Sequence, residues 1–248
     1  MTAHSARQRV LRQASWETGL LLRNGEQLLL TIIIPLGLLA VLTLTDLVPA
    51  ITGPDGTRIA SSLATVLSVS VLSAAFTSLA IATAFERRSG ALRFLGTTPL
   101  TRGELMVGKI IATTLVMLLS ATLTAVVAVV IGWRPQSGSL WVIPLLLLGT
   151  AAWAPWAIAM AGTLRAESVL ALANGAFLLF LMFGGIVIPP ESLPAVLASV
   201  TPFLPSGALT EGLSSALVEG SVSVAVLAVL AGWAAGGSLL AARTFRWS

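Results

Sequence analysis

The sequence predicts an all-α membrane protein with six transmembrane helices, and three observations support that prediction. The composition is 56% apolar and only 10% charged, whereas a soluble domain carries about a quarter charged residues. Apolar runs of about twenty residues, enough for a helix to cross about 30 Å of hydrocarbon, recur along the chain. These runs lack the period-two alternation that is typical of membrane β-barrels. Because a helix satisfies its own backbone hydrogen bonds in lipid, we expect helical spans.

The apolar runs define six expected spans and their orientation. The spans cover Leu28–Val48, Ala60–Phe85, Leu105–Ile131, Leu140–Thr163, Val169–Ile188 and Val222–Ala242. Cytoplasmic termini place two basic residues outside, Arg58 and Arg134, and twelve inside, as the positive-inside rule favours. The inside set is Arg7, Arg9, Arg12, Arg23, Arg87, Arg88, Arg93, Arg102, Lys109, Arg165, Arg243 and Arg246. We therefore expect a multi-pass protein of the cell membrane, and the pI of about 11.3 needs no nucleic-acid partner.

Residues 5–26 precede the first span and predict an amphipathic helix on the cytoplasmic membrane surface. At 100° per residue, one arc collects Val10, Leu11, Ala14, Thr18, Leu21 and Leu22. The opposite side collects Arg9, Arg12, Trp16 and Arg23. Arginines over anionic headgroups and apolar residues in the acyl boundary would hold such a helix in the interface plane. The alternative is a positively charged anchor that only sets the topology.

Residues 86–104 form an inner loop between the second and third spans, where charge is concentrated. Seven of the chain's charged residues lie within residues 84–109: Glu86, Arg87, Arg88, Arg93, Arg102, Glu104 and Lys109. The loop also carries an apolar ridge, Leu92, Phe94 and Leu95, and a break at Pro99. These features favour a short helix that binds a cytoplasmic partner, because apolar anchors give affinity and rim charges steer. The alternative is a basic loop that serves topology alone.

Residues 189–220 are too long for a turn and too apolar for a solvated loop. Prolines divide this segment into pieces too short to span a bilayer, such as Ala195–Val200 and Gly207–Val218. Irregular backbone at membrane depth is tolerated only against protein or a wet cavity. We therefore expect a re-entrant segment at an outer gate, where the alternative is a cap lying on the surface. The gate residues would be Pro189, Pro190, Pro202 and Pro205.

Several kinds of chemistry are excluded. Gly103 to Lys109 has the G-x-x-x-x-G-K spacing of a phosphate-binding loop, but Ile110 stands where Ser or Thr is needed and a span begins there. No cysteine and one histidine, His4, leave no thiol chemistry, His-based metal site or triad. The only two aspartates, Asp46 and Asp55, sit at or beyond the outer membrane edge, which excludes an intramembrane enzyme built on paired aspartates.

The spans also hold essentially none of the charged groups that ion-coupled carriers use, and Asn174 is expected to bond between helices. We therefore expect a chain that is no enzyme and binds no cofactor or metal itself. The energy for any transport would then come from another subunit.

The charged loop resembles that of the membrane subunits of type-2 ABC transporters, which export drugs, lipids and glycoconjugates. In that family the loop typically reads E-R-E-x-G-T-L-E-x-L-x-x-T-P-L-S-x-x-E-L-x-x-G-K. The departures are Arg88 and Arg93, where the family often has acids, and Ala91 in place of Thr. The matches are Glu86-Arg87, Gly90, Leu92, Leu95, Thr98-Pro99-Leu100, Glu104-Leu105 and Gly108-Lys109. The amino-terminal helix, the six spans and the Pro-rich segment extend the resemblance over most of the chain.

The resemblance implies a single transmembrane permease domain, residues 1–248, of an ATP-driven exporter. The loop would be a coupling helix in a cleft of an ATP-binding subunit, in contact through Glu86, Arg87, Gly90, Leu92, Leu95, Pro99 and Leu100. Two such subunits would bind ATP and Mg²⁺, and a second permease copy, in a homodimer rather than a heterodimer, would complete the path through the bilayer. Two alternatives remain: a non-transporting scaffold or regulator that docks a cytoplasmic partner, and an ABC permease of the cytochrome-maturation type.

Overall fold

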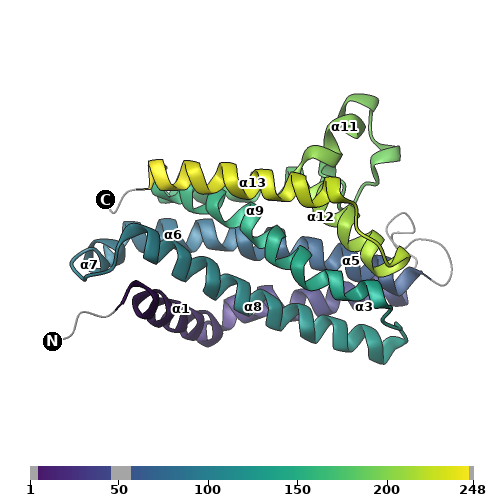
Figure 1. The fold of residues 1–248 in the computed structure, drawn as a ribbon, viewed down its shortest axis with the longest axis horizontal. Helices are drawn as coiled ribbons and strands as arrows, with labels where there is room; N and C mark the ends of the chain where they lie inside the picture. The colour runs from purple at the N-terminus through teal and green to yellow at the C-terminus, as the bar shows by residue number, and fades with distance from the viewer. Residues whose placement is uncertain (1–4, 46–56, 246–248) are drawn as a thin grey trace.

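The computed structural model describes residues 5–45 and 57–245, a part of the chain that contains helices and no strand. The expectations for His4, Asp46, Asp55, Arg246 and the end of the first span at Val48 fall outside these residues. Long helices run side by side in an elongated bundle (Figure 1). The first turns of α1, the short helix α7 and the last turn of α13 lie at one end, while α11 and α12 lie toward the other.

The amino-terminal part consists of one separate helix and one apolar helix. Helix α1 (Ala6–Arg23) starts at a capping box of Ser5 and Gln8 and ends at Asn24, whose backbone is extended. Helix α2 (Gly25–Leu28), the π-helical segment η1 (Leu29–Ile33) and α3 (Ile34–Leu44) then follow without a break. The predicted first span thus corresponds to a shorter apolar helix, Leu29–Leu44.

Within residues 5–45 and 57–245, five helices are long and apolar enough to cross a membrane. They match the other five predicted spans, so the chain is a multi-pass membrane protein. One is a continuous helix of α5 (Arg58–Val71), the π-helical segment η2 (Leu72–Ser78) and α6 (Leu79–Arg88). The others are α8 (Arg102–Ile131), α9 (Val142–Thr163) extended by the 3₁₀ turn η3 (Ser137–Trp141), α10 (Ala166–Phe183) and α13 (Val224–Thr244).

The core lies around the α5–η2–α6 helix and α9. Of the apolar window of α5–η2–α6, 78% is buried, against 17% for α10 and 22% for α13. Trp153 of α9 contacts the rings of Phe76 and Phe180, with centroids 5.2 and 4.8 Å away. Helix α9 packs on α13, where Trp156 Nε1 donates to the Trp233 carbonyl at 3.0 Å. Helices α10 and α13 therefore lie at the periphery, where most of their residues are not buried.

The Pro-rich segment is divided into short helices, as predicted. They are η4 (Pro190–Ser192), α11 (Ala195–Val200), η5 (Thr201–Phe203), α12 (Pro205–Ser214) and the π-helical segment η6 (Ser215–Glu219). Helix α10 ends at Phe183, earlier than the predicted Ile188, because Gly184 and Gly185 follow and Gly185 has a φ of +79°. Helix α11 stands off the bundle (Figure 1), and its depth in a bilayer stays a prediction.

Candidate functional site

The candidate site is the charged end of the bundle, built around the turn from α6 into α7 (Ala91–Leu95). Gly90 makes that turn with a φ of +83°, a conformation that glycine adopts without strain. Within α7, Leu92 is fully buried, Leu95 is half-buried and Phe94 is 74% exposed. The predicted apolar ridge is therefore divided: Leu92 packs the loop onto the bundle, and Phe94 lies on the surface.

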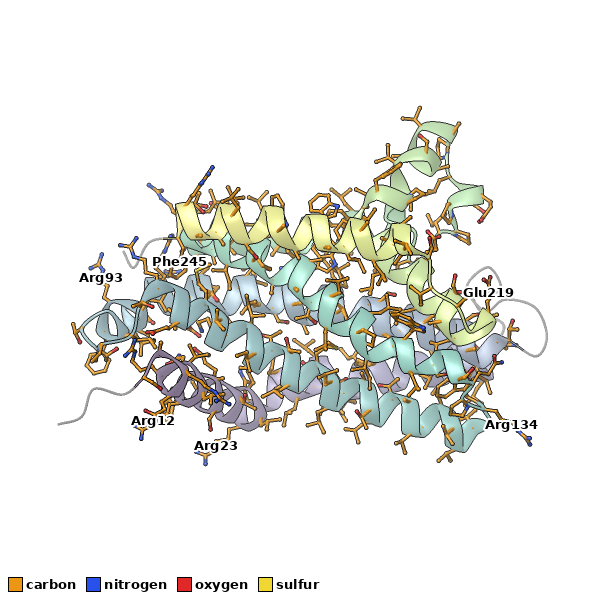
Figure 2. The ribbon with its side chains drawn as sticks, viewed as in Figure 1. Arg12, Arg23, Arg93, Arg134, Glu219 and Phe245 are labelled. Atoms are coloured by element: carbon orange, nitrogen blue, oxygen red, sulfur yellow. The ribbon has the colours of Figure 1, made fainter. Side chains whose placement is uncertain are left out.

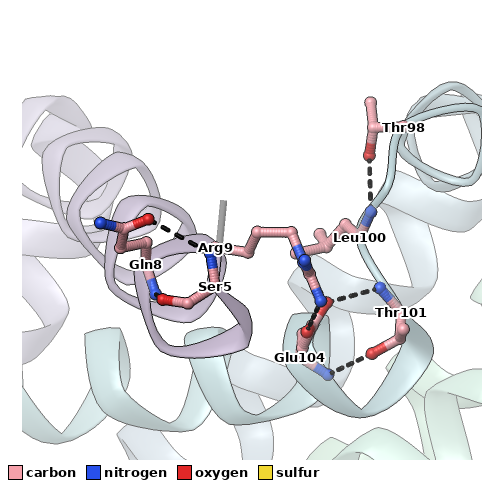
Figure 3. Close-up of polar contacts among 7 residues, drawn as sticks. All are labelled: Ser5, Gln8, Arg9, Thr98, Leu100, Thr101 and Glu104. Carbon is pink, nitrogen blue, oxygen red and sulfur yellow. Dashed lines mark hydrogen bonds and ion pairs between the residues drawn. The ribbon is translucent and has the colours of Figure 1, made fainter. Parts of the chain in front are cut away.

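A capping box starts α8 directly after this loop. The Glu104 N–H donates to Thr101 Oγ1 at 3.3 Å, and the Thr101 N–H donates to Glu104 Oε2 at 2.9 Å. Glu104 also accepts hydrogen bonds from Arg9 Nε at 3.0 Å and from Arg9 Nη2 at 2.5 Å (Figure 3). The hydrogen bond with Glu104 raises the pKa of the Arg9 guanidinium, which stays charged. The pair ties the first turns of α1 to the start of α8.

A buried lysine joins three helices next to this pair. Lys109 of α8 is 3% exposed, and its Nζ lies 2.8 Å from Glu17 Oε1 of α1 and 2.7 Å from Glu86 Oε2 of α6. Gln13 Nε2 donates a further hydrogen bond to Glu17 at 2.8 Å. A buried charge is tolerated only when it is paired and hydrogen-bonded, so these contacts hold α1, α6 and α8 together.

The sequence did not predict this cluster of Glu17, Glu86 and Lys109, although Lys109 was noted as a basic residue of the inner side and as part of the loop motif. A signal was present, because an ionisable residue inside a predicted span demands a partner. The predicted span Leu105–Ile131 thus contains a charged residue, Lys109, at its end next to the loop.

Helix α1 packs on α8 through a face that includes Ala14 of the predicted apolar arc. Its buried residues are Gln13, Ala14 and Glu17, while Leu11 of the predicted apolar arc is 51% exposed. At Gly108 of α8 the two helices approach so closely that a Cβ atom would lie 2.7 Å from Gln13 Cγ. The Arg9–Glu104 and Glu17–Lys109 ion pairs accompany this close approach of the two helices.

The four residues predicted on the polar side of α1 lie in two different settings. Arg9 turns toward Glu104 instead of the exposed side, which corrects its predicted position. Arg12, Trp16 and Arg23 are exposed, as expected. Figure 2 shows Arg12 and Arg93 toward one end of the bundle and Arg134 and Glu219 at the other.

Further contacts brace the loop against its neighbours. The Arg87 guanidinium donates to the Leu164 carbonyl, between α9 and α10, and Arg88 pairs with Glu167 of α10. Arg102 Nη1 donates to the carbonyl of Phe245, just after α13, at 3.2 Å. These contacts tie the loop to the ends of α9, α10 and α13.

The residues predicted to contact a partner therefore lie in three settings. Glu86, Arg87 and Leu92 make contacts inside the bundle, whereas Gly90, Leu95 and Leu100 are partly exposed. Pro99 is exposed, and so are Arg93 and Phe94, which the contact set did not include.

The predicted gate residues lie at the opposite end. Pro189, Pro190 and Pro202 line a cavity of about 810 Å³, and Pro205 is buried in the first turn of α12. Asn174 donates to the Leu170 carbonyl of its own helix, so the expected interhelical hydrogen bond is wrong.

The fold defines a multi-pass helical membrane protein with a braced, charged loop at one end. The chain matches the ABC-2 family transporter protein family over residues 45–243, and it belongs to this family of ABC transporter permeases. It is 30% identical over 168 residues to the probable multidrug ABC transporter permease YbhS of Escherichia coli strains K12 and O157:H7. The alignment covers 66% of this chain and 44% of each relative, so the chain spans less than half the length of these relatives.

Proposed function

We propose that this chain is the permease subunit of an ATP-driven exporter and that residues 86–104 couple it to separate ATP-binding subunits. The observation that carries the proposal is the exposed Phe94, a large aromatic side chain held on a braced helix beside exposed Arg93 and Pro99. Aromatic anchors surrounded by polar groups are the residues that dominate protein interfaces. ATP and Mg²⁺ would bind to the partner subunits.

The internal contacts of the loop support this coupling role. Arg87, Arg88 and Arg102 link the loop to α9, α10 and the end of α13, and the Lys109 cluster links α6 to α1 and α8. A displacement of the loop by a partner would therefore move several helices together. The contact set then contains Arg93, Phe94, Pro99 and Leu100, while Glu86, Arg87 and Leu92 transmit the movement.

The proposal includes a second copy of the chain. An open cavity of about 780 Å³ lies between α3, the α5–η2–α6 helix and α10, and α10 is the least buried of the five candidate spans. A second copy against α10 would enclose this cavity and complete a path. The charged end would face the cytoplasm of a cell membrane, where ATP is available, so both termini would be cytoplasmic. Since the relatives are named as probable multidrug permeases, drugs are the expected cargo.

Co-purification from membranes tests the coupling surface. The intact chain should recover an ATP-binding subunit, and Phe94→Ser should lose most of that recovery, because the apolar anchor is removed without disturbing buried Leu92. Leu140→Ser is the matched control, since Leu140 is 75% exposed and lies in η3, far from the loop in sequence. Equal recovery with both variants would reject this loop as the docking surface.

A further inference from the structure

Two open cavities follow one another along the same wall of the bundle. The cavity of about 780 Å³ is lined by Ser70, Ser73 and Thr77 of the α5–η2–α6 helix, and the cavity of about 810 Å³ by Ser61 and Thr65 of that helix. The first cavity is called the inner cavity here and the second the outer cavity. Residues four apart lie on one face of a helix, so Ser61 and Thr65 of the outer cavity lie in one row with Ser73 and Thr77 of the inner cavity, interrupted only by Val69. Asn174 of α10 lines the inner cavity, and Ile186, just after α10, lines the outer one.

The inner cavity suits an apolar molecule that carries a hydrogen-bonding atom. None of the described residues that line it is charged. Thr77 is only 9% exposed, and its hydroxyl has no hydrogen-bond partner among the described residues. A buried polar group without a partner is costly, so a ligand atom there would be stabilised. The π-helical segments η1 and η2 both contribute to the wall, through Leu30 and Thr77, and such segments are frequent at functional sites.

The outer cavity has a single sign of charge. Among the described residues, Glu191, Glu211 and Glu219 line it and no basic side chain does, and none of the three carboxylates makes an ion pair or hydrogen bond with another described residue. The basic residues near this end, Arg58 and Arg134, line a neighbouring cavity. Low-dielectric walls with one sign of charge focus the field and concentrate ions of the opposite sign.

We propose that these two cavities form a path that selects lipophilic cations over lipophilic anions. The proposal rests on the proposed export function, because it names the substrate class of that function. The uncharged inner cavity accommodates the apolar body and Thr77 binds a polar atom of it. The three carboxylates attract the cationic group as it reaches the outer cavity, whereas an anion of equal size meets like charge.

Binding of two probes of matched shape tests this selectivity. Tetraphenylphosphonium and tetraphenylborate have nearly the same size and opposite charge. Their affinity is measured for the purified chain in nanodiscs of zwitterionic lipid, without any ATP-binding subunit. Replacing all three carboxylates (Glu191→Gln, Glu211→Gln and Glu219→Gln) should lower the ratio of phosphonium to borate affinity by about tenfold, as screened charges at this range predict. Because all variants are measured in the same lipid, the contribution of each probe's partitioning into lipid cancels when the affinity ratios of two variants are compared.

The controls separate charge from folding. Glu167→Gln removes an exposed carboxylate at the charged end and should leave the ratio unchanged. Thr77→Val keeps the side-chain shape, so it should weaken binding of rhodamine 6G, a cation with an ester carbonyl, and leave tetraphenylphosphonium binding unaffected. An unchanged ratio in the triple variant, or a Thr77→Val effect that is equal for both cations, would overturn the proposal.

These outcomes are distinct from failure of the export proposal. Because the binding assay contains no ATP-binding subunit, charge-selective binding supports the site even when no such subunit co-purifies. Recovery of an ATP-binding subunit by a chain that binds both probes equally would instead retain the exporter and reject the cation path.

Discussion

Lys109 is the residue on which the charged end of the bundle depends most. Its ammonium group compensates two carboxylates from different helices, at 2.8 Å from Glu17 and 2.7 Å from Glu86. Removing one member of a buried ion pair destabilises a protein far more than replacing all of its members by uncharged residues. The charges that remain are then buried with neither water nor an ion-pair partner. The loss of stability on mutation therefore depends on which of the three charges is removed.

Lys109→Met should lower the free energy of unfolding by about 3 kcal/mol, because Glu17 and Glu86 would then repel each other without a cation. Thermal unfolding in detergent measures the effect, and exposed Arg134→Gln serves as the control. Combining Lys109→Met with Glu17→Gln and Glu86→Gln should restore most of the lost stability. A triple variant no more stable than Lys109→Met would contradict the assigned role of charge.

For single residues, the sequence predicted which residues belong to the loop but not which side chains face the bundle. The matches at Gly90, Leu92 and Pro99 located the loop, but a five-residue helix has too little periodicity to show that Leu92 faces inward and Phe94 outward. Arg9 and Glu104 are far apart in the sequence, as are Glu17 and Lys109. Pairing at such separation depends on how α1 docks, which local patterns do not encode.

The elements themselves follow from the demands of a bilayer. Long apolar runs must become helices because lipid offers no partner for backbone groups, so five predicted spans match observed helices within a few residues. Prolines predicted the short helices of residues 189–220 for equally local reasons. The packing of α1 on α8 involves the Arg9–Glu104 and Glu17–Lys109 ion pairs, which local patterns do not encode.

Helix α10 is the element with the clearest consequence for assembly. The chain has no cysteine, so a single introduced cysteine reports on one position. Leu178→Cys, at a residue 59% exposed on α10, should form a disulfide-linked dimer on mild oxidation in membranes if a second copy covers this helix. Leu239→Cys, 53% exposed on α13, is the matched control and should stay monomeric. A dimer from Leu239→Cys alone would place the copies against α13 instead.

The two ends of the whole molecule differ in the segments and cavities that they carry. One end carries the braced loop of residues 86–104 with exposed Phe94, and the other carries the Pro-rich segment and the acidic outer cavity. The hydroxyl-lined wall of α5–η2–α6 connects them through the most buried helix of the bundle. Movement imposed at the loop would therefore reach the cavity wall directly through α6 and η2.

The central claim is that this chain converts ATP hydrolysis by a partner into movement of the permease. The most direct measurement is the rate of ATP hydrolysis by the ATP-binding subunit in lipid vesicles, alone, with the intact chain and with the Phe94→Ser chain. The account predicts that the intact chain raises the rate about tenfold and that Phe94→Ser abolishes most of the increase, since coupling free energies of 1–3 kcal/mol correspond to changes of this size. A subunit that binds the intact chain yet hydrolyses ATP at the same rate without it would contradict coupling and favour a scaffold.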